Sequence, residues 1–155
     1  MIRVSSNSAA DWAYSRVGDV RLRRLARKAD MNQFSICCWW SRAYFSARDQ
    51  AKFFWRLERL TPMRFRDYAI GLLRSIVPRQ SWGIPRVGRS RGASVFFKGG
   101  WRGTGLGQLV HQASFIRYRG AGFSLAVLTD GNPSKSYGID TVAGVARKIL
   151  RVGPD

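Results

Sequence analysis

Three segments with strong β-forming character follow one another in the second half of the chain, and they constrain the fold more than any other feature. They span residues 93–98, 107–119 and 123–130. The Arg-Gly-Ala-Gly sequence at 119–122 is typical of a hairpin turn, which joins antiparallel neighbours. The third segment is continuously apolar, as in a strand that is covered on both faces. The sequence therefore predicts an antiparallel sheet of three strands.

Helices are predicted on both sides of these strands in the sequence. Apolar residues recur at helical spacing in five segments: 7–17, 19–29, 46–60, 61–76 and 139–152. Gly18 ends the first segment, and Ser46 with Asp49 forms a capping box before the third. We interpret residues 78–91 as a basic connector. The pattern predicts an α+β domain over residues 1–155, with a helical part at 1–80 and the sheet with its packed C-terminal helix at 92–152.

The chain is strongly basic, with 27 lysines and arginines, 9 acidic residues and a formal net charge of +18. Such a surface attracts phosphate polymers, acidic lipids or an anionic cell envelope. Most of the basic residues are arginines, which GC-rich coding sequences also produce. Coding bias with a generic affinity for anionic surfaces therefore explains the charge more simply than a dedicated nucleic-acid site.

Cys37 and Cys38 are adjacent, so they cannot form a Cys-x-x-Cys motif, and a disulfide between them would strain the intervening peptide. We therefore expect buried, reduced thiols. No apolar run has the length of a transmembrane segment, and no signal peptide follows Met1. His111, the only histidine, has no carboxylate or cysteine near it in sequence, and we interpret it as a packed or surface residue.

Two short motifs carry the candidate chemistry. Lys98 ends the first predicted strand and is followed by Gly99, Gly100 and Trp101. A lysine beside residues without side chains places a positive charge next to open backbone N–H groups, which suits a site that holds a carboxylate and polarises a carbonyl. The second motif is the Ser-x-Asn sequence at residues 5–7, which opens the first helix.

In this order, the two motifs and the strand and turn at 125–134 resemble the penicillin-recognising serine hydrolases: class A β-lactamases, D,D-peptidases and other penicillin-binding proteins. The signatures of that superfamily are Ser-x-x-Lys, Ser-Asp-Asn and Lys-Thr-Gly. The second is present as Ser5-Ser6-Asn7 and the third as Lys98-Gly99-Gly100, but no serine here has a lysine three residues later. The resemblance runs to about Leu150 and implies the β-lactamase/transpeptidase-like fold with a truncated sheet.

The resemblance also implies a catalytic role for three residues. Ser5 would relay a proton to the leaving nitrogen, and Asn7 would hold the amide of the substrate. Lys98 would impose a positive electrostatic potential on Ser5 and attract the substrate carboxylate. The local sequence also allows that Ser5 or Ser6 is only a helix N-cap and that Lys98 is an ordinary lysine at a strand end.

On the same resemblance, the three residues that follow Lys98 in the sequence would bind the substrate. Gly100 lets the substrate lie close to the strand, and the backbone N–H of Trp101 corresponds to one of two oxyanion donors. Gly99 stands where the family has Thr or Ser, so the hydroxyl that binds the substrate carboxylate is missing. This departure puts carboxylate recognition in doubt.

The complete enzyme that the resemblance implies performs acyl transfer on an amide substrate, such as a β-lactam or a peptidoglycan-like peptide, outside the cytoplasm and without a cofactor. This chain lacks the nucleophile motif, so we expect it to be inactive alone. Glu58, its only glutamate, is not in the Glu-x-x-Leu-Asn context of the deacylating glutamate.

A rival interpretation is a basic, non-catalytic protein that binds nucleic acid or an anionic cell-envelope polymer. We further expect Met1 to be an internal methionine of a longer coding sequence. On that view the large side chains of Trp12, Phe54, Leu125 and Val127 lack the segment against which they would pack.

Overall fold

The three predicted strands pair into one antiparallel sheet in the order β1-β2-β3 in the computed structural model, which describes residues 1–151. They are β1 (Ser94–Thr104), β2 (Gly107–Tyr118) and β3 (Ala121–Asn132). Tight turns at 105–106 and 119–120 join them, as the glycine-rich sequences there predict. The α+β prediction is confirmed.

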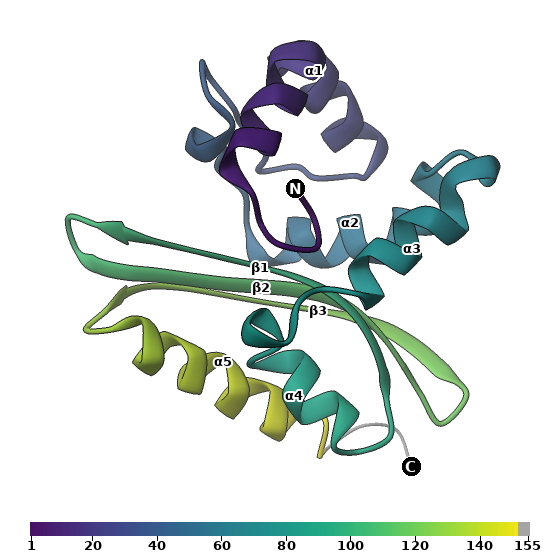
Figure 1. Ribbon diagram of the computed structural model, residues 1–155, viewed down its shortest axis with the longest axis vertical. Coiled ribbons are helices and arrows are strands. Elements are labelled where there is room, and N and C mark those ends of the chain that lie inside the picture. The colour runs from purple at the N-terminus through teal and green to yellow at the C-terminus, as the bar shows by residue number, and fades with distance from the viewer. Residues whose placement is uncertain (152–155) are drawn as a thin grey trace.

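Helices cover both faces of this sheet (Figure 1). α4 (Ile84–Arg89) and α5 (Lys135–Ile149) cover one face, and α2 (Ala47–Leu60) and α3 (Arg66–Arg74) lie on the other. α1 (Asn7–Lys28) lies on the side of α2 and α3, farther from the sheet. Three short 3₁₀ turns complete the described chain: η1 (Trp40–Arg42), η2 (Met63–Phe65) and η3 (Pro78–Gln80). Val152, the predicted end of the last helix, lies outside the described residues.

The strands contribute side chains to two separate hydrophobic cores, because successive side chains of a strand point to opposite faces of the sheet. Val95 and Phe97 of β1 enter the larger core, which α4 and α5 close, whereas Phe96 packs with Phe54 and Leu73 of α2 and α3. Lys98 follows Phe97 and so belongs to the face that α2 and α3 cover. The alternation in β1 therefore decides on which side of the sheet the candidate chemistry lies.

The expectation that four large side chains lack a packing partner is wrong for three of them. Leu125 and Val127 are only 8% and 7% exposed because α5 covers their face of the sheet, and Phe54 is 6% exposed in the core between α2, α3 and the sheet. Trp12 is 61% exposed on α1. The guanidinium of Arg16 lies over its ring, with Cζ 3.8 Å from the ring centroid.

The segment at 78–91 is not a plain connector, because it contains η3 and the buried helix α4. Ile84 and Val87 of α4 are part of the larger core. The fully buried Gln112 of β2 fixes this segment: its Nε2 donates to the Trp82 carbonyl (2.9 Å), and its Oε1 accepts from the Ile84 N–H (2.7 Å). Both partners come from tertiary structure, so local sequence could not indicate them.

Two local signals in the first half of the chain are placed as predicted, whereas the helix predicted over residues 61–76 begins only at Arg66, as α3, after η2. Gly18 interrupts α1 with a left-handed φ of 64°, and the helix resumes at Asp19. Ser46 caps α2, and the Asp49 carboxylate completes the capping box. Asp49 is buried and also accepts the N–H groups of Asn32 and Gln33, so it ties the irregular segment before α2 to that helix.

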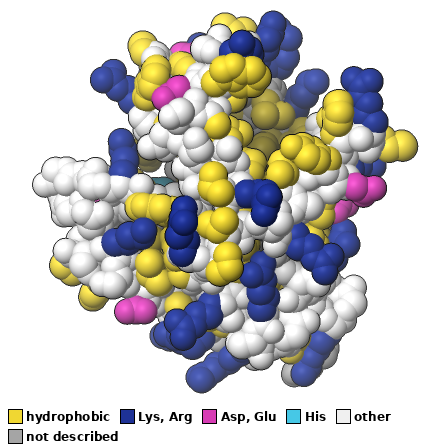
Figure 2. Space-filling view, in the orientation of Figure 1, with side chains coloured by type: hydrophobic (Ala, Val, Ile, Leu, Met, Phe, Trp, Pro, Cys, Tyr) yellow, Lys and Arg dark blue, Asp and Glu magenta, His cyan; other side chains and the backbone are white. Residues whose placement is uncertain are grey.

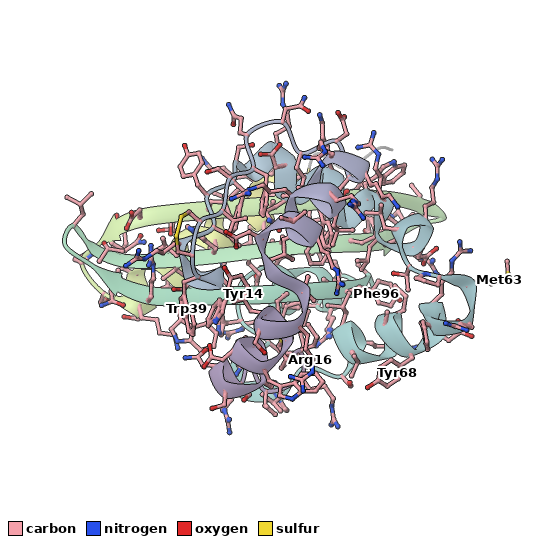
Figure 3. The ribbon with its side chains drawn as sticks, turned by 90° about the horizontal axis from the view of Figure 1, so that it is seen from above. Tyr14, Arg16, Trp39, Met63, Tyr68 and Phe96 are labelled. Carbon is pink, nitrogen blue, oxygen red and sulfur yellow. A yellow bond between two sulfur atoms is a disulfide. The ribbon has the colours of Figure 1, made fainter. Side chains whose placement is uncertain are left out.

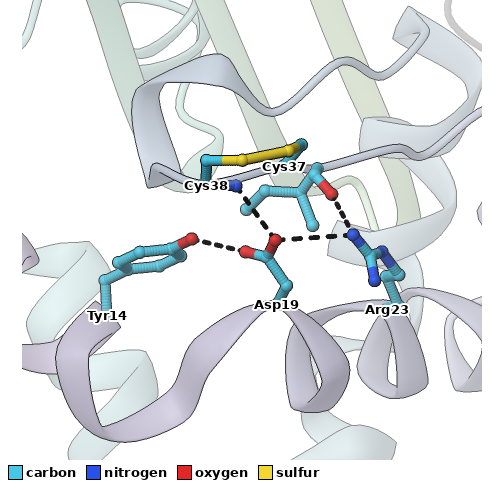
Figure 4. The surroundings of a disulfide bond; sticks show 6 residues. Tyr14, Asp19, Arg23, Cys37 and Cys38 are labelled. Carbon is cyan, nitrogen blue, oxygen red and sulfur yellow. Dashed lines mark hydrogen bonds and ion pairs between the residues drawn. A yellow bond between two sulfur atoms is a disulfide. The ribbon is translucent and has the colours of Figure 1, made fainter.

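Cys37 and Cys38 form a disulfide, which corrects the expectation of buried, reduced thiols (Figure 4). Both cysteines are exposed because they lie in the irregular segment before η1 rather than in a core. The Cys38 N–H donates to Asp19, which also accepts the Tyr14 hydroxyl and pairs with Arg23. The Tyr14 hydrogen bond, followed by that of Cys38, holds the pKa of Asp19 below its ordinary value.

Aromatic packing adds to this link between α1 and the following segment. The Tyr14 and Trp39 rings meet edge to face with centroids 5.8 Å apart (Figure 3). The Trp40 indole N–H donates to Asp11 at 2.6 Å. These contacts connect α1, which begins at Asn7 of the Ser-x-Asn sequence, to the segment that contains Trp39 and Trp40.

Candidate active site

Ser5 and Lys98 meet in the structure although they are 93 positions apart in the sequence. The Lys98 Nζ donates to the Ser5 Oγ at 2.8 Å and also to the Gly99 carbonyl. The strand β1 fixes the lysine, and the segment before α1 brings the serine to it. The two residues expected to act together therefore share one cleft.

The neighbouring serine, Ser6, is the one that caps α1. Its Oγ accepts the N–H of Ala9 at 3.2 Å. Ser5 stands just before this cap with a left-handed backbone (φ 54°), a conformation that non-glycine residues rarely adopt. Because Ser6 performs the capping, the hydroxyl of Ser5 remains available to Lys98.

Lys98 is half-buried, and its acceptors are a hydroxyl and a carbonyl rather than a carboxylate. Burial lowers the pKa of the Lys98 ammonium, because the charged form loses solvation. A desolvated cation without an anionic partner attracts an incoming anion strongly. Lys98 is therefore suited to binding the carboxylate of a ligand.

Two adjoining cavities meet at Lys98. The inner one, of about 430 Å³, lies between α2, α3 and the sheet and has mainly apolar walls, including Phe53, Phe54 and Leu73. The outer one, of about 510 Å³, is lined by residues that include Ser5, Asn7 and Arg102. Lys98, Gly99, Gly100 and His111 line both. No acidic side chain lines either cavity within residues 1–151, so the cleft is basic.

The glycines after Lys98 differ in the space around them. A Cβ added at Gly100 would meet no atom within 4 Å, whereas one at Gly99 would lie 3.1 Å from Cζ2 of Trp82. The Trp82 ring in turn packs edge to face on Trp101, with centroids 6.0 Å apart, and the Lys135 Nζ lies 3.9 Å from the centroid of the Trp101 ring. Trp82 therefore occupies the space toward which a longer side chain at position 99 would extend.

His111 is a cleft residue that sequence reasoning did not single out as functional. It lies opposite Gly100 in the β1–β2 ladder, and its Nδ1 accepts the N–H of Thr129 at 3.2 Å. Burial lowers the pKa of its imidazole. The signal that could have found it is the turn at 105–106, because a two-residue turn there pairs position 100 with position 111.

Asn7 and Trp101 line the outer cavity, so all six predicted site residues surround the same cleft. Glu58 does not: its carboxylate pairs with Arg117 at 2.7 Å, and it lines neither cavity. Within residues 1–151 no group of three or more His, Cys, Asp or Glu side chains is placed to hold a metal ion, and no helix is long and apolar enough to cross a membrane.

Comparison with protein-family models identifies the family of the chain. A family model described as the Beta-lactamase enzyme family matches residues 1–152. A search of curated proteins finds no match. Solved structures are similar in fold at low sequence identity, which by itself indicates the fold and not the activity.

Three of these structures illustrate the likeness. The β-lactamase from Sphaerobacter thermophilus has a TM-score of 0.80 and 19% identity, and the match covers 97% of this chain and 59% of that one. PBP-A has a TM-score of 0.72 and 20% identity, with 97% and 58% covered. The β-lactamase from Francisella tularensis has a TM-score of 0.77 and 14% identity, with 96% and 62% covered. The chain thus spans about three fifths of the length of these structures.

Proposed function

Because the chain belongs to the Beta-lactamase enzyme family, we propose that the Ser5–Lys98 cleft is the proton-transfer and substrate-binding side of an acyl-transfer site. The observation that carries the proposal is the 2.8 Å hydrogen bond from Lys98 to Ser5 at the junction of two cavities. The proposed substrate is an amide that bears a carboxylate, such as a β-lactam or a peptidoglycan-like peptide.

The direction of the hydrogen bond supports a proton relay through Ser5. Because the Ser5 Oγ accepts from Lys98, its own proton is free to be donated toward the outer cavity. A leaving nitrogen held there would take that proton. As Ser5 gives up this proton, the Lys98 ammonium would pass one of its own protons to the Ser5 Oγ, so that no alkoxide remains. Before that transfer, Lys98 and Arg102, which lines the same cavity, would attract the carboxylate of the substrate.

The proposed roles of the remaining site residues follow from their positions. Gly100 has no side chain and open space where a Cβ would lie, so an acyl group can approach the strand closely there. Trp101 would offer its backbone N–H to the developing oxyanion, and Asn7 would bind the amide of the substrate. Since this sequence has no Ser-x-x-Lys, we propose that the chain alone binds the substrate without forming an acyl-enzyme.

The proposal is tested by titrating the protein with benzylpenicillin while recording backbone amide NMR signals and the intact mass. We expect saturable shifts at residues 98–101 and no covalent adduct. Lys98→Met should abolish the shifts, whereas the control Lys148→Met, at an exposed position of α5, should leave them unchanged. Equal binding by both variants, or a covalent adduct on any serine, would contradict the proposal.

A second candidate is non-catalytic binding to a polyanion, which the surface charge favours. The ion pairs within residues 1–151 use only four basic residues: Arg23, Lys52, Arg56 and Arg117. Figure 2 shows lysine and arginine side chains distributed over the visible face with few acidic ones between them. Affinity for duplex DNA, measured against salt concentration, tests this: binding that persists near about 0.15 M salt supports it, and its absence there opposes it.

A further inference from the structure

A third cavity lies at the outer edge of the sheet, and it shares no lining residue with the two cavities at Lys98. Its volume is about 280 Å³. It is lined by Arg74, Arg89, Ala93 and the first three residues of β1, at 94–96. Three separate parts of the chain, the last turns of α3 and α4 and the start of β1, therefore converge on it.

Both arginines line this cavity, are exposed, and have no counter-ion among the described residues. Within residues 1–151 neither Arg74 nor Arg89 forms an ion pair or a side-chain hydrogen bond, and no acidic side chain lines the cavity. The Arg89 Cζ lies 5.5 Å from the centroid of the Phe97 ring, a cation–π contact that orients its guanidinium. Two like charges at one cavity repel each other unless an anion lies between them.

The start of β1 supplies further donors to the same cavity. Among the described strands β1 is an edge strand, paired with β2 alone, so alternate peptide groups along it point away from the sheet. Ser94, which is exposed, also lines the cavity and carries a hydroxyl. Planar guanidinium forks, a hydroxyl and backbone N–H groups are the donors with which proteins bind phosphoryl oxygens.

We propose that this cavity, here called the Arg74–Arg89 pocket, binds a phosphoryl group, either as free phosphate or as the phosphate monoester of a larger molecule. Two positive charges match the two negative charges of such a group near neutral pH. The site is independent of the acyl-transfer cleft, so either proposal can fail without the other.

The test is binding of inorganic phosphate and of glycerol 3-phosphate to the whole 155-residue protein at constant ionic strength, followed by amide and arginine side-chain NMR signals. We expect saturable shifts at residues 93–96 and at the Nε–H groups of Arg74 and Arg89. Binding of phosphate alone would identify the free ion as the ligand, and binding of both would identify a monoester site.

Variants distinguish a specific phosphate-binding site from general attraction of anions to a basic surface. Arg74→Gln and Arg89→Gln should each weaken binding roughly tenfold or more, since each removes a charge-assisted contact. The matched control is Arg24→Gln with Arg27→Gln, two exposed arginines of α1, which should bind as the parent does. Shifts that fall elsewhere in the unmodified protein, no saturation, or equal weakening in the control would each overturn the proposal.

Discussion

Gly99 and Gly100 offer a matched pair of substitutions that tests why this chain departs from the Lys-Thr-Gly signature. Gly→Ala at a compatible position stabilises a protein by about 0.4–1 kcal/mol, because the unfolded chain loses freedom. Gly100→Ala should show this gain, since its Cβ would meet nothing within 4 Å. Gly99→Ala places a Cβ 3.1 and 3.2 Å from two ring atoms of Trp82, so that ring has to move.

The expected difference between the two variants follows from these terms. Overpacking costs about 1–3 kcal/mol, from which the same entropic gain of about 0.4–1 kcal/mol is subtracted. Gly99→Ala should therefore be less stable than Gly100→Ala by about 1–3 kcal/mol, or by several degrees in Tm at about 2–4 °C per kcal/mol. Urea unfolding and calorimetry measure this difference.

A third variant identifies Trp82 as the cause. In a Trp82→Leu background the ring is absent, so the difference between Gly99→Ala and Gly100→Ala should largely disappear. If the two alanine variants are equally stable in the parent protein, Trp82 does not restrict position 99, and the glycine there needs another explanation. If the difference persists without the Trp82 ring, the strain arises elsewhere.

Three further outcomes are expected. Lys98→Met should unfold at the same or a higher urea concentration at pH 7. In the parent protein, the lowered pKa of Lys98 makes the free energy of unfolding rise with pH up to about pH 10.5, the pKa of lysine in the unfolded chain, and the variant should lose this rise. A clear loss of stability at pH 7 would contradict this. The pKa of His111, measured by NMR, should lie below 6.5, because burial disfavours the charged imidazole. The stability that the neutral imidazole contributes should be lost as the pH falls through that lowered pKa. A pKa above 6.5 would show that burial is not the main influence on this imidazole. Asp49→Ala should cost about 2–4 kcal/mol in urea unfolding, since it removes the carboxylate of the capping box and leaves the N–H groups of Asn32, Gln33 and Ser46 without their acceptor. A loss under about 0.5 kcal/mol would mean that water replaces the carboxylate.

Local signals in the sequence predicted the three strands, the break at Gly18 and the capping box of α2, although β1 continues to Thr104 past its predicted end at Lys98. Each depends on residues that lie close together in the chain, so hairpin turns, helix caps and hydrophobic periodicity are sufficient to predict them. Alternation along a strand also places Lys98 on the face of Phe96 and opposite that of Phe97, but the helices that cover each face are known only from the structure.

The site required more than local pattern. Ser5 and Lys98 are 93 positions apart, and their motifs were connected only through the family resemblance; no spacing rule predicts a contact over that distance. His111 entered the cleft because the register of the β1–β2 ladder places it opposite Gly100. Strand register depends on the turn and on both faces of the sheet together, so a single segment does not reveal it.

Tertiary packing alone decided the remaining features. α4 is buried because Gln112 binds its first turn and α5 covers it, although the segment at 78–91 is basic and rich in Gly and Pro. Trp82 reaches the space beside Gly99, and Arg74 and Arg89 meet at one cavity, through the paths of helices that are distant in sequence. Such contacts join side chains whose relative positions are fixed only when the whole chain has folded, which is why composition and periodicity could not foresee them.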